Sequence, residues 1–381
     1  MSGENIPLND LSRHWQQTAP VVKPAVERVA ASGRYVLGQE VATFERAFAD
    51  YCGVRHCIGV GSGTDALELV LRALGCGAGD EVITVANAGP YAAAAILATG
   101  ARPRFVDIDA TSMTICADAL AQALERPARA LIVTHLYGQL ADMEALAQRA
   151  ARHGLLLIED CAQAHEAERG GRRAGAWGTA GCFSFYPTKN LGALGDAGAV
   201  VTDNDALAER VARLRQYGWT TKYHAAEPGG RNSRLDELQA AVLHSKLPYL
   251  DRWNERRRAI AADYGRGLAA CDLVTPAIGG PDHVAHLYVV RSQRRDALRR
   301  DLEARGIATE VHYPVAEPRQ PALRGLTVPA PALPETERAV SQVLSLPCFP
   351  EMTQAEVALV TAAVKDCCRP GEGREDVVSS G

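Results

Sequence analysis

Between residues 54 and 202, short apolar runs alternate with longer stretches in which apolar residues recur at helical spacing. The apolar runs are "HCIGV", "EVITV", "PRFVDI", "RALIVTH" and "LLLIED", and stretches such as "DALELVLRAL" and "DMEALAQRAARHG" lie between them. Strands that alternate with amphipathic helices form βαβ units, whose parallel sheet is covered by helices on both faces. We therefore predict an α/β fold with the functional site at the carboxyl ends of the strands.

The remainder of the chain predicts a second, smaller unit. Residues 205–253 have a mostly helical pattern that the polar, glycine-rich "HAAEPGGRNS" interrupts, and a further α/β pattern ("HLYVV", "RRDALRRDLEARGI", "TQAEVALVTAAVKDCC") follows residue 270. We expect a large domain at 1–250 that begins with a helical segment, and a small C-terminal α/β domain at 251–369. The polar residues 370–381 predict a disordered tail.

Composition excludes several classes of partner. The 381 residues include 41 Lys+Arg and 45 Asp+Glu, so the net charge of −4 gives no electrostatic basis for binding nucleic acid or an anionic membrane. No signal-peptide pattern opens the chain, and no apolar run approaches the roughly 20 residues of a membrane span. The ten cysteines have no CxxC pair or zinc-type spacing. We expect a cytoplasmic protein with reduced thiols and no metal.

The first candidate motif is the glycine-rich turn "GVGSGTDALELVLRALG", residues 59–75. A turn from strand to helix exposes backbone N–H groups at the positive end of the helix dipole, which suits a phosphate. The third glycine of a dinucleotide fingerprint is replaced by Thr64, and no Walker lysine follows, so NAD and ATP are disfavoured. A structural turn capped by Ser62 or Thr64 is the alternative for this stretch alone.

The second motif is "LLLIEDCAQAHEA", where a fully apolar strand ends on Glu159 and Asp160. A carboxylate in this position is partly desolvated and requires a cationic partner or a metal, but the spacing fits no zinc or magnesium pattern. Pairing with a protonated ring nitrogen is another solution, and pyridoxal phosphate requires such an aspartate. A helix cap or a solvated loop acid is the structural alternative.

The third motif is "FSFYPTKNLGALGD", which contains Lys189, 29 positions (189 − 160) after Asp160. A Schiff-base lysine needs a site where its amine can lose its proton, and it must reach both cofactor and substrate. A surface lysine in a turn is the plain alternative. The order of phosphate loop, aspartate and lysine favours a pyridoxal-phosphate enzyme.

Nearly end to end, from "SGRYVLGQEVATFERAFADYCG" to "ATEVHYPV", the chain resembles the pyridoxal-phosphate-dependent sugar aminotransferases of the DegT/DnrJ/StrS family. The resemblance implies the aspartate-aminotransferase-like fold, called fold type I, with pyridoxal 5′-phosphate as cofactor. It implies that Lys189 forms the internal aldimine and moves protons, that Asp160 binds the pyridine nitrogen, and that Gln163 lies against the hydroxyl side of the ring. It also implies a homodimer with a shared active site, in which the phosphate is held by Gly63, Thr64, Ser184 and the neighbouring subunit's residue matching Asn232.

By the same resemblance, the sequence around Lys189 indicates which substrate the protein uses. "SFYP-x-K-NLGA-x-GD-x-GA" and "HLYG" are similar to members that aminate carbon 3 of a nucleotide-linked 3-keto-6-deoxyhexose, whereas many that aminate carbon 4 read closer to "SFH-x-x-K". We expect transfer of an amino group from glutamate to carbon 3 of a dTDP-linked sugar, in deoxyaminosugar biosynthesis. Candidate contacts to sugar or nucleotide, for each of which packing is the alternative, are Tyr186, His135, Tyr137, His312 and Tyr313.

Two departures from the family pattern stand out. "NAGPYAAA" has Gly89 near the position of the aromatic residue that stacks on the cofactor ring, so Tyr91 becomes the candidate for that role. Glu166 follows "QAH" where the family usually has glycine, and it either adds a charge near the site or lies in a surface loop.

Other functions stay open at the level of sequence. The same machinery could aminate a 4-keto nucleotide sugar or a cyclitol ketone (an inosose), while a related sugar dehydratase carries His where Lys189 stands. A regulatory protein with this fold would be marked by loss of Lys189, Asp160 or Asn232, and all three are present.

Overall fold

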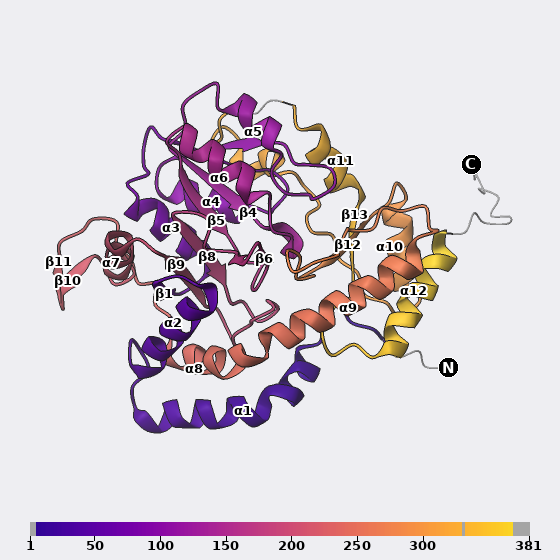
Figure 1. Ribbon diagram of the computed structural model, residues 1–381, viewed down its shortest axis with the longest axis horizontal. Helices are drawn as coiled ribbons and strands as arrows, with labels where there is room; N and C mark the ends of the chain where they lie inside the picture. The colour runs from indigo at the N-terminus through magenta and orange to yellow at the C-terminus, as the bar shows by residue number, and fades with distance from the viewer. Residues whose placement is uncertain (1–4, 330–331, 369–381) are drawn as a thin grey trace, which may run out of the picture.

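The computed structural model describes residues 5–329 and 332–368, which form an α/β structure around one large sheet (Figure 1). The strands of this sheet are β1 (His56–Val60), β2 (Glu81–Val85), β3 (Arg102–Val106), β4 (Ala130–Thr134), β5 (Leu156–Asp160), β8 (Ala180–Ser184) and β9 (Gly198–Thr202). Their order is β1-β9-β8-β5-β4-β2-β3, and only β9 runs antiparallel to its two neighbours. The predicted, mostly parallel sheet is confirmed.

The sheet is buried on both faces, as the apolar runs predicted. In β4, Leu131 and Val133 belong to the core on one face, and Ala130 and Ile132 belong to the core on the other. This alternation follows from the two-residue period of a strand. One face is covered by α3 (Gly63–Ala73), α4 (Tyr91–Ala98) and α7 (Asp205–Leu214), and the other by α2 (Gln39–Cys52), α5 (Ala117–Ala123) and α6 (Met143–Arg152).

Several helices begin and end at residues suited to that role. The Asp10 carboxylate caps α1 (Leu11–Ser32) by accepting hydrogen bonds from two backbone N–H groups, and the helix ends at Gly33 with φ of +64°. The Ser62 hydroxyl caps α3 and the Asn204 amide oxygen caps α7 in the same way. Among the described helices, none combines the length and apolar character needed to cross a bilayer.

The C-terminal part, or C-terminal unit, contains a small antiparallel strand pair with helices around it. The helix α8 (Glu237–Lys246) is followed by α9 (Leu250–Leu268), which runs from beside α8 towards this unit (Figure 1). The unit contains an antiparallel pair, β12 (Tyr288–Arg291) with β13 (Val343–Leu346), and the helices α10 (Arg295–Glu303), α11 (Pro334–Gln342) and α12 (Gln354–Cys368). The domain boundary at residue 250 falls at the start of α9 and stays a prediction, and the predicted tail at 370–381 lies outside the described residues.

The shortest elements were not foreseen. They are the strand pairs β6 (Glu168–Arg169) with β7 (Arg172–Arg173) and β10 (Trp219–Thr221) with β11 (His224–Ala225), and the 3₁₀ helices η1 (Leu136–Gly138), η2 (Leu247–Tyr249), η3 (Glu317–Arg319) and η4 (Pro321–Leu323). Two or three residues carry no periodicity, so pattern reasoning cannot detect them. A single bridge between Ile6 and Ile307, which joins the start of the described chain to the C-terminal unit, has no local signal either.

An aromatic cluster joins α2 to the end of β8, where the lysine-bearing loop begins. The ring of Phe48 is fully buried, with ring centroids 5.0 Å from Phe183, 5.2 Å from Phe185 and 5.5 Å from Phe44. Such offset and edge-to-face contacts add to the free energy of burying the rings. The loop that follows β8 is therefore built on a rigid base.

We expect Phe48→Ala to lower the free energy of unfolding by about 3 to 5 kcal/mol, because it removes a fully buried ring and leaves a cavity. Chemical denaturation followed by circular dichroism measures this change. The control is Tyr223→Ala, which removes a ring that is 78% exposed. Equal unfolding midpoints for the two variants would contradict the packing role of Phe48.

Candidate active site

A cavity of about 570 Å³ lies where the strands of the main sheet end. Its wall includes Ser62, which follows β1, Ala88, which follows β2, and the last residues of β4, β5 and β8. The site predicted at the carboxyl ends of the strands therefore has a matching space. The structure brings to it Gly63, Thr64, Tyr91, Asp160, Gln163, Ser184, Tyr186, Lys189, His312 and Tyr313.

One end of the cavity is suited to an anion. Gly63 and Thr64 form the first turn of α3, whose N–H groups have no partner within the helix. The hydroxyl-bearing residue Ser184 lies directly against this turn, because a Cβ added to Gly63 would be 2.7 Å from the Ser184 Cβ. Only glycine permits this approach. The helix terminus and the two hydroxyl side chains form a cradle for a phosphate.

Asp160 supplies a buried carboxyl group at the end of β5. It is 7% exposed, and its Oδ1 accepts a hydrogen bond of 3.1 Å from the Ala162 N–H. Burial raises the pKa of Asp160, while that backbone N–H and the nearby Lys189 oppose the shift. Among the described residues, no cationic side chain lies in ion-pair contact with it, so a protonated ring nitrogen would supply the missing partner.

Lys189 follows β8 in a loop and lines the same cavity. Its backbone N–H donates to the Tyr186 carbonyl at 2.8 Å, while its ammonium has no hydrogen bond or ion pair within the described chain. Burial lowers the pKa of Lys189 to about 8, although Asp160 acts in the opposite direction. A lysine of this kind gives up its proton more readily than a surface lysine, as a nucleophilic amine must.

Gln163 and two tyrosines form a further part of the wall. The Gln163 side chain accepts a hydrogen bond of 2.6 Å from the Tyr137 N–H and donates one of 3.3 Å to the Tyr313 hydroxyl. The Tyr91 and Tyr313 rings meet edge to face at 6.1 Å. A Cβ at Gly89, where φ is +79°, would lie 3.0 Å from the Tyr91 ring. The space beside Gly89 is thus filled by these tyrosines, and Tyr91 stays the candidate for ring stacking.

His135 is a correction to the sequence-based expectation of a substrate contact. The ring is fully buried, its Nε2 donates to Glu159 at 3.0 Å, and its Nδ1 accepts from the Ala141 N–H at 3.2 Å. Both ring nitrogens are therefore used inside the fold. His135, Glu159 and Cys161 lie close enough to suggest a metal site, but the Glu159 carboxylate already accepts four hydrogen bonds. His135 and Glu159 therefore belong to a structural hydrogen-bond network.

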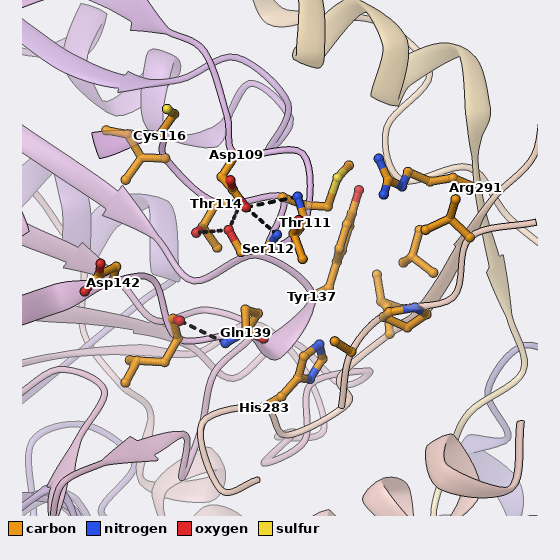
Figure 2. A pocket seen from close by; sticks show the side chains of 18 of the residues that line it. Asp109, Thr111, Ser112, Thr114, Cys116, Tyr137, Gln139, Asp142, His283 and Arg291 are labelled. Carbon is orange, nitrogen blue, oxygen red and sulfur yellow. Dashed lines mark hydrogen bonds between the residues drawn. The ribbon is translucent and has the colours of Figure 1, made fainter. Parts of the chain in front are cut away.

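Tyr137 is a second correction, because it lines a separate cavity of about 440 Å³ (Figure 2). Its backbone has φ of +60°, which is uncommon for a bulky residue. Its N–H donates to Gln163 and its hydroxyl donates to the His312 carbonyl. Tyr137 therefore supports two residues of the larger cavity from behind and does not line that cavity itself.

Asn232 and Glu166 also lie outside the larger cavity. Asn232 is exposed and pairs through its backbone with Gln216, so its predicted contact across a subunit interface stays a prediction. Glu166 forms an ion pair of 3.3 Å with Arg258 of α9. Glu166 therefore binds α9 and does not line the larger cavity.

Sequence reasoning missed three buried polar residues in or behind this wall. Arg257 of α9 and His286 line the cavity, and both are less than 10% exposed. Glu317 is fully buried beside Ala88, with no hydrogen-bond partner for either carboxyl oxygen. The predicted helical pattern ended at residue 253, so it did not include the run "NERRRAIAADY", and nothing in that run indicates which arginine points inward. The run "AEPRQPALRG" has no helical or strand period.

A half-buried lysine, a buried carboxyl group and a helix N-terminus at the carboxyl edge of a parallel sheet form the kind of site that pyridoxal-phosphate enzymes use. Residues 18–365 match the model of the DegT/DnrJ/EryC1/StrS aminotransferase family. The chain belongs to this family, which confirms the predicted family, fold and enzyme class, and with them the cofactor.

Individual relatives cover nearly the whole chain. The dTDP-3-amino-3,4,6-trideoxy-alpha-D-glucose transaminase of Streptomyces venezuelae is 47% identical over 95% of this chain and 96% of its own length. The pleiotropic regulatory protein of Geobacillus stearothermophilus is 44% identical, with 96% of this chain and 99% of that protein covered.

Solved structures agree with the fold. S. venezuelae DesV in complex with a ketimine intermediate superposes with a TM-score of 0.93 at 45% identity, over 97% of this chain and all of that chain. The Bacillus subtilis protein ntda, which carries the cofactor pmp, has a TM-score of 0.89 at 30% identity, over 96% of this chain and 86% of that one.

The buried Glu317 generates a prediction about stability and pH. Burial is the main cause that raises the pKa of this carboxyl group well above 4.5. The folded protein therefore keeps a proton that the unfolded chain releases above pH 4.5, so folding loses stability as pH rises towards the folded-state pKa. We expect Glu317→Gln to raise the melting temperature relative to the native protein, and to raise it more at pH 8 than at pH 5.

Differential scanning fluorimetry across this pH range provides the measurement. The control is Glu303→Gln, because Glu303 is exposed. A melting-temperature difference between Glu317→Gln and the native protein that does not change with pH would show that the Glu317 carboxyl is ionised in the fold.

Proposed function

We propose that the protein transfers an amino group from glutamate to carbon 3 of a dTDP-linked 3-keto-6-deoxyhexose. The observation that carries the proposal is the gathering of Lys189, Asp160 and the α3 N-terminus around one cavity in a chain of this family. The relative from S. venezuelae that is named for a dTDP-3-amino sugar supports carbon 3 and the dTDP group.

The residues present fit pyridoxal phosphate. The N–H groups of α3 with Thr64 and Ser184 would hold the phosphate, and Asp160 would keep the ring nitrogen protonated. When bound, the cofactor supplies an electron sink for the bonds of the reacting carbon. Lys189, with its lowered pKa, is placed to take a proton from that carbon and to return one.

Gln163 and Tyr313 would orient the ring. Gln163 is fixed from behind by the Tyr137 N–H, so its amide has one orientation towards the cavity. Tyr186, which is 52% exposed, and His312 line the same cavity and are the proposed sugar contacts. Their exposure to the cavity suits a polar substrate that enters from solvent.

The finer parts of the assignment also belong to this proposal. A homodimer with a shared site is supported by the exposure of Asn232 outside its own cavity. The net charge of −4 supports small-molecule partners over nucleic acid and membranes. The protein would act in the cytoplasm. The large and small domains would divide at residue 250.

The main alternatives use the same cavity. A 4-keto nucleotide sugar or an inosose would need the same lysine and aspartate. The loop sequence around Lys189 is similar to that of members that aminate carbon 3, and this favours carbon 3. A regulatory role without turnover is raised by the name of one relative. Retention of Lys189 and Asp160 in one cavity favours an enzyme.

The proposal is tested by incubating the purified protein with glutamate and a panel of 3-keto and 4-keto dTDP sugars and an inosose. We expect new amine only at carbon 3 of the dTDP 3-keto-6-deoxyhexose, located by NMR. Lys189→Ala should lose both turnover and the yellow absorption of a lysine-bound cofactor. Turnover by a colourless Lys189→Ala protein, or amination at carbon 4 alone, would refute the assignment.

The shared site is tested by mixing Lys189→Ala and Asn232→Ala protomers, each of which should be inactive alone. Random mixing should restore about a quarter of native activity, because half of the dimers are mixed and each has one intact site. The measurement is turnover after denaturation and co-refolding, with differently tagged protomers to isolate mixed dimers. Inactive mixed dimers would argue against a contribution of Asn232 across the interface.

A further inference from the structure

The smaller cavity lies next to the larger one, and no step of the proposed reaction uses it. Its volume of about 440 Å³ is typical of small-ligand sites. The loop between β3 and α5 forms one side, and residues in and before β12 form the other. Tyr137 and Leu287 line it, and Leu287 also lines the larger cavity. The two cavities therefore share part of their wall.

Arg291 is a charged side chain of this wall that the fold does not use. Asp109 lies near Arg291 but accepts its hydrogen bonds, of 2.9 and 2.8 Å, from backbone N–H groups of its own loop. Asp118 and Asp142 lie 3.5 and 4.0 Å from arginines, and Arg169 pairs with a further acid at 3.0 Å. Arg291 is half-buried, yet within residues 5–329 and 332–368 its side chain forms neither an ion pair nor a hydrogen bond.

His283 supplies a second free donor to the same cavity. The ring is 3% exposed, and its Nδ1 accepts a hydrogen bond of 3.0 Å from the Ala285 N–H. The ring proton is therefore on Nε2, which has no hydrogen-bond partner in the described part of the chain. Burial is the main cause that lowers the pKa of His283 to about 4, so the ring is neutral at pH 7 and donates without a charge.

The remaining wall suits the apolar body of a ligand. Figure 2 shows the Tyr137 ring between Thr111 and Arg291, with His283 below it. Buried apolar side chains complete this part of the cavity: Met113, Ile115 and Val289. An arginine fork binds two oxygens of a carboxylate or phosphate, and a flat ring can stack on an aromatic side chain. The wall thus matches an anion that carries a flat apolar group.

We propose that the smaller cavity binds an organic anion with a flat apolar body, and that this ligand acts on the larger cavity through Tyr137. The Tyr137 N–H donates to Gln163 at 2.6 Å and its hydroxyl donates to the His312 carbonyl, and both partners line the larger cavity. A ligand packed on the Tyr137 ring therefore contacts the residue that holds both of them. The effect on the keto sugar rests on the proposed function, whereas the anion site itself does not.

Benzoate and phenyl phosphate are the probes, and benzamide is the matched neutral molecule. In calorimetry of the cofactor-loaded protein, we expect at least one of the two anions to bind, and its head group identifies the ligand as a carboxylate or a phosphate. Benzamide should bind at least about tenfold more weakly, because it lacks the charge that pairs with Arg291. Binding of neither anion, or equal binding of benzamide, would overturn the proposal.

A variant of the arginine shows where the anion binds. We expect Arg291→Gln to weaken the anion by at least about tenfold and to keep the native melting temperature, because the side chain has no partner in the described fold. The matched control is Arg294→Gln, which changes an exposed arginine outside both cavities and should bind the anion like the native protein. Unchanged anion binding by folded Arg291→Gln would place the anion elsewhere and refute the site.

Turnover of the keto sugar measures the link between the cavities. Saturating anion should change the KM for the keto sugar by about fivefold or more, and the keto sugar should change the affinity for the anion by the same factor, since coupling between two binding sites is reciprocal. Tyr137→Phe keeps the ring but removes the contact to the His312 carbonyl, so it should bind the anion and lose most of this change.

Two results would contradict the link through Tyr137. One is a native KM that does not respond to bound anion, and the other is a full response in Tyr137→Phe. If no keto sugar is aminated at all, the proposed function fails, while the calorimetry with Arg291→Gln still decides whether the anion site exists.

Discussion

Two neighbouring acids at the end of β5 organise this molecule, because successive residues of a strand point to opposite sides of the sheet. Glu159 is fully buried and gathers the N–H groups of Gly175, Trp177 and Gly178 together with the His135 ring. It thereby fixes the loop that leads into β8 against the end of β4. Asp160 faces the opposite side, where its carboxyl group accepts a hydrogen bond from the Ala162 N–H and forms no ion pair with a described residue.

The different surroundings of Glu159 and Asp160 explain how a rigid framework can surround a cavity whose charged groups lack partners. On the scaffold side the Glu159 carboxylate accepts four hydrogen bonds, and such buried networks hold their geometry well. The cavity side retains a buried carboxyl group, a lysine that readily loses its proton and a buried arginine that backbone carbonyls hold. Each of these is costly in an empty fold and favourable only with the matching part of a ligand. The charged side chains that have no partner on the cavity side are therefore the ones that we expect to contact ligands.

Much of this was predictable from local pattern. The runs "HCIGV" and "EVITV" coincide with β1 and β2, and the motifs around Thr64, Asp160 and Lys189 fall at one cavity because parallel strands end at a common edge. His135 was misjudged because a polar residue at a strand end looks the same whether it points to the cavity or to Glu159. Arg257 and Glu317 were missed because their environment is made by chain segments far away in sequence, which no periodicity records.

The bridge between Ile6 and Ile307 has a consequence for recombining relatives of this protein. Leu8 and Asn9, just after Ile6, form part of the cavity wall beside residues of the C-terminal unit. A chimaera that takes its sheet from one parent and its C-terminal unit from another would bring together segments that had not adapted to each other. Residues 6–9 should therefore be inherited with the C-terminal unit, although they lie far from it in the sequence.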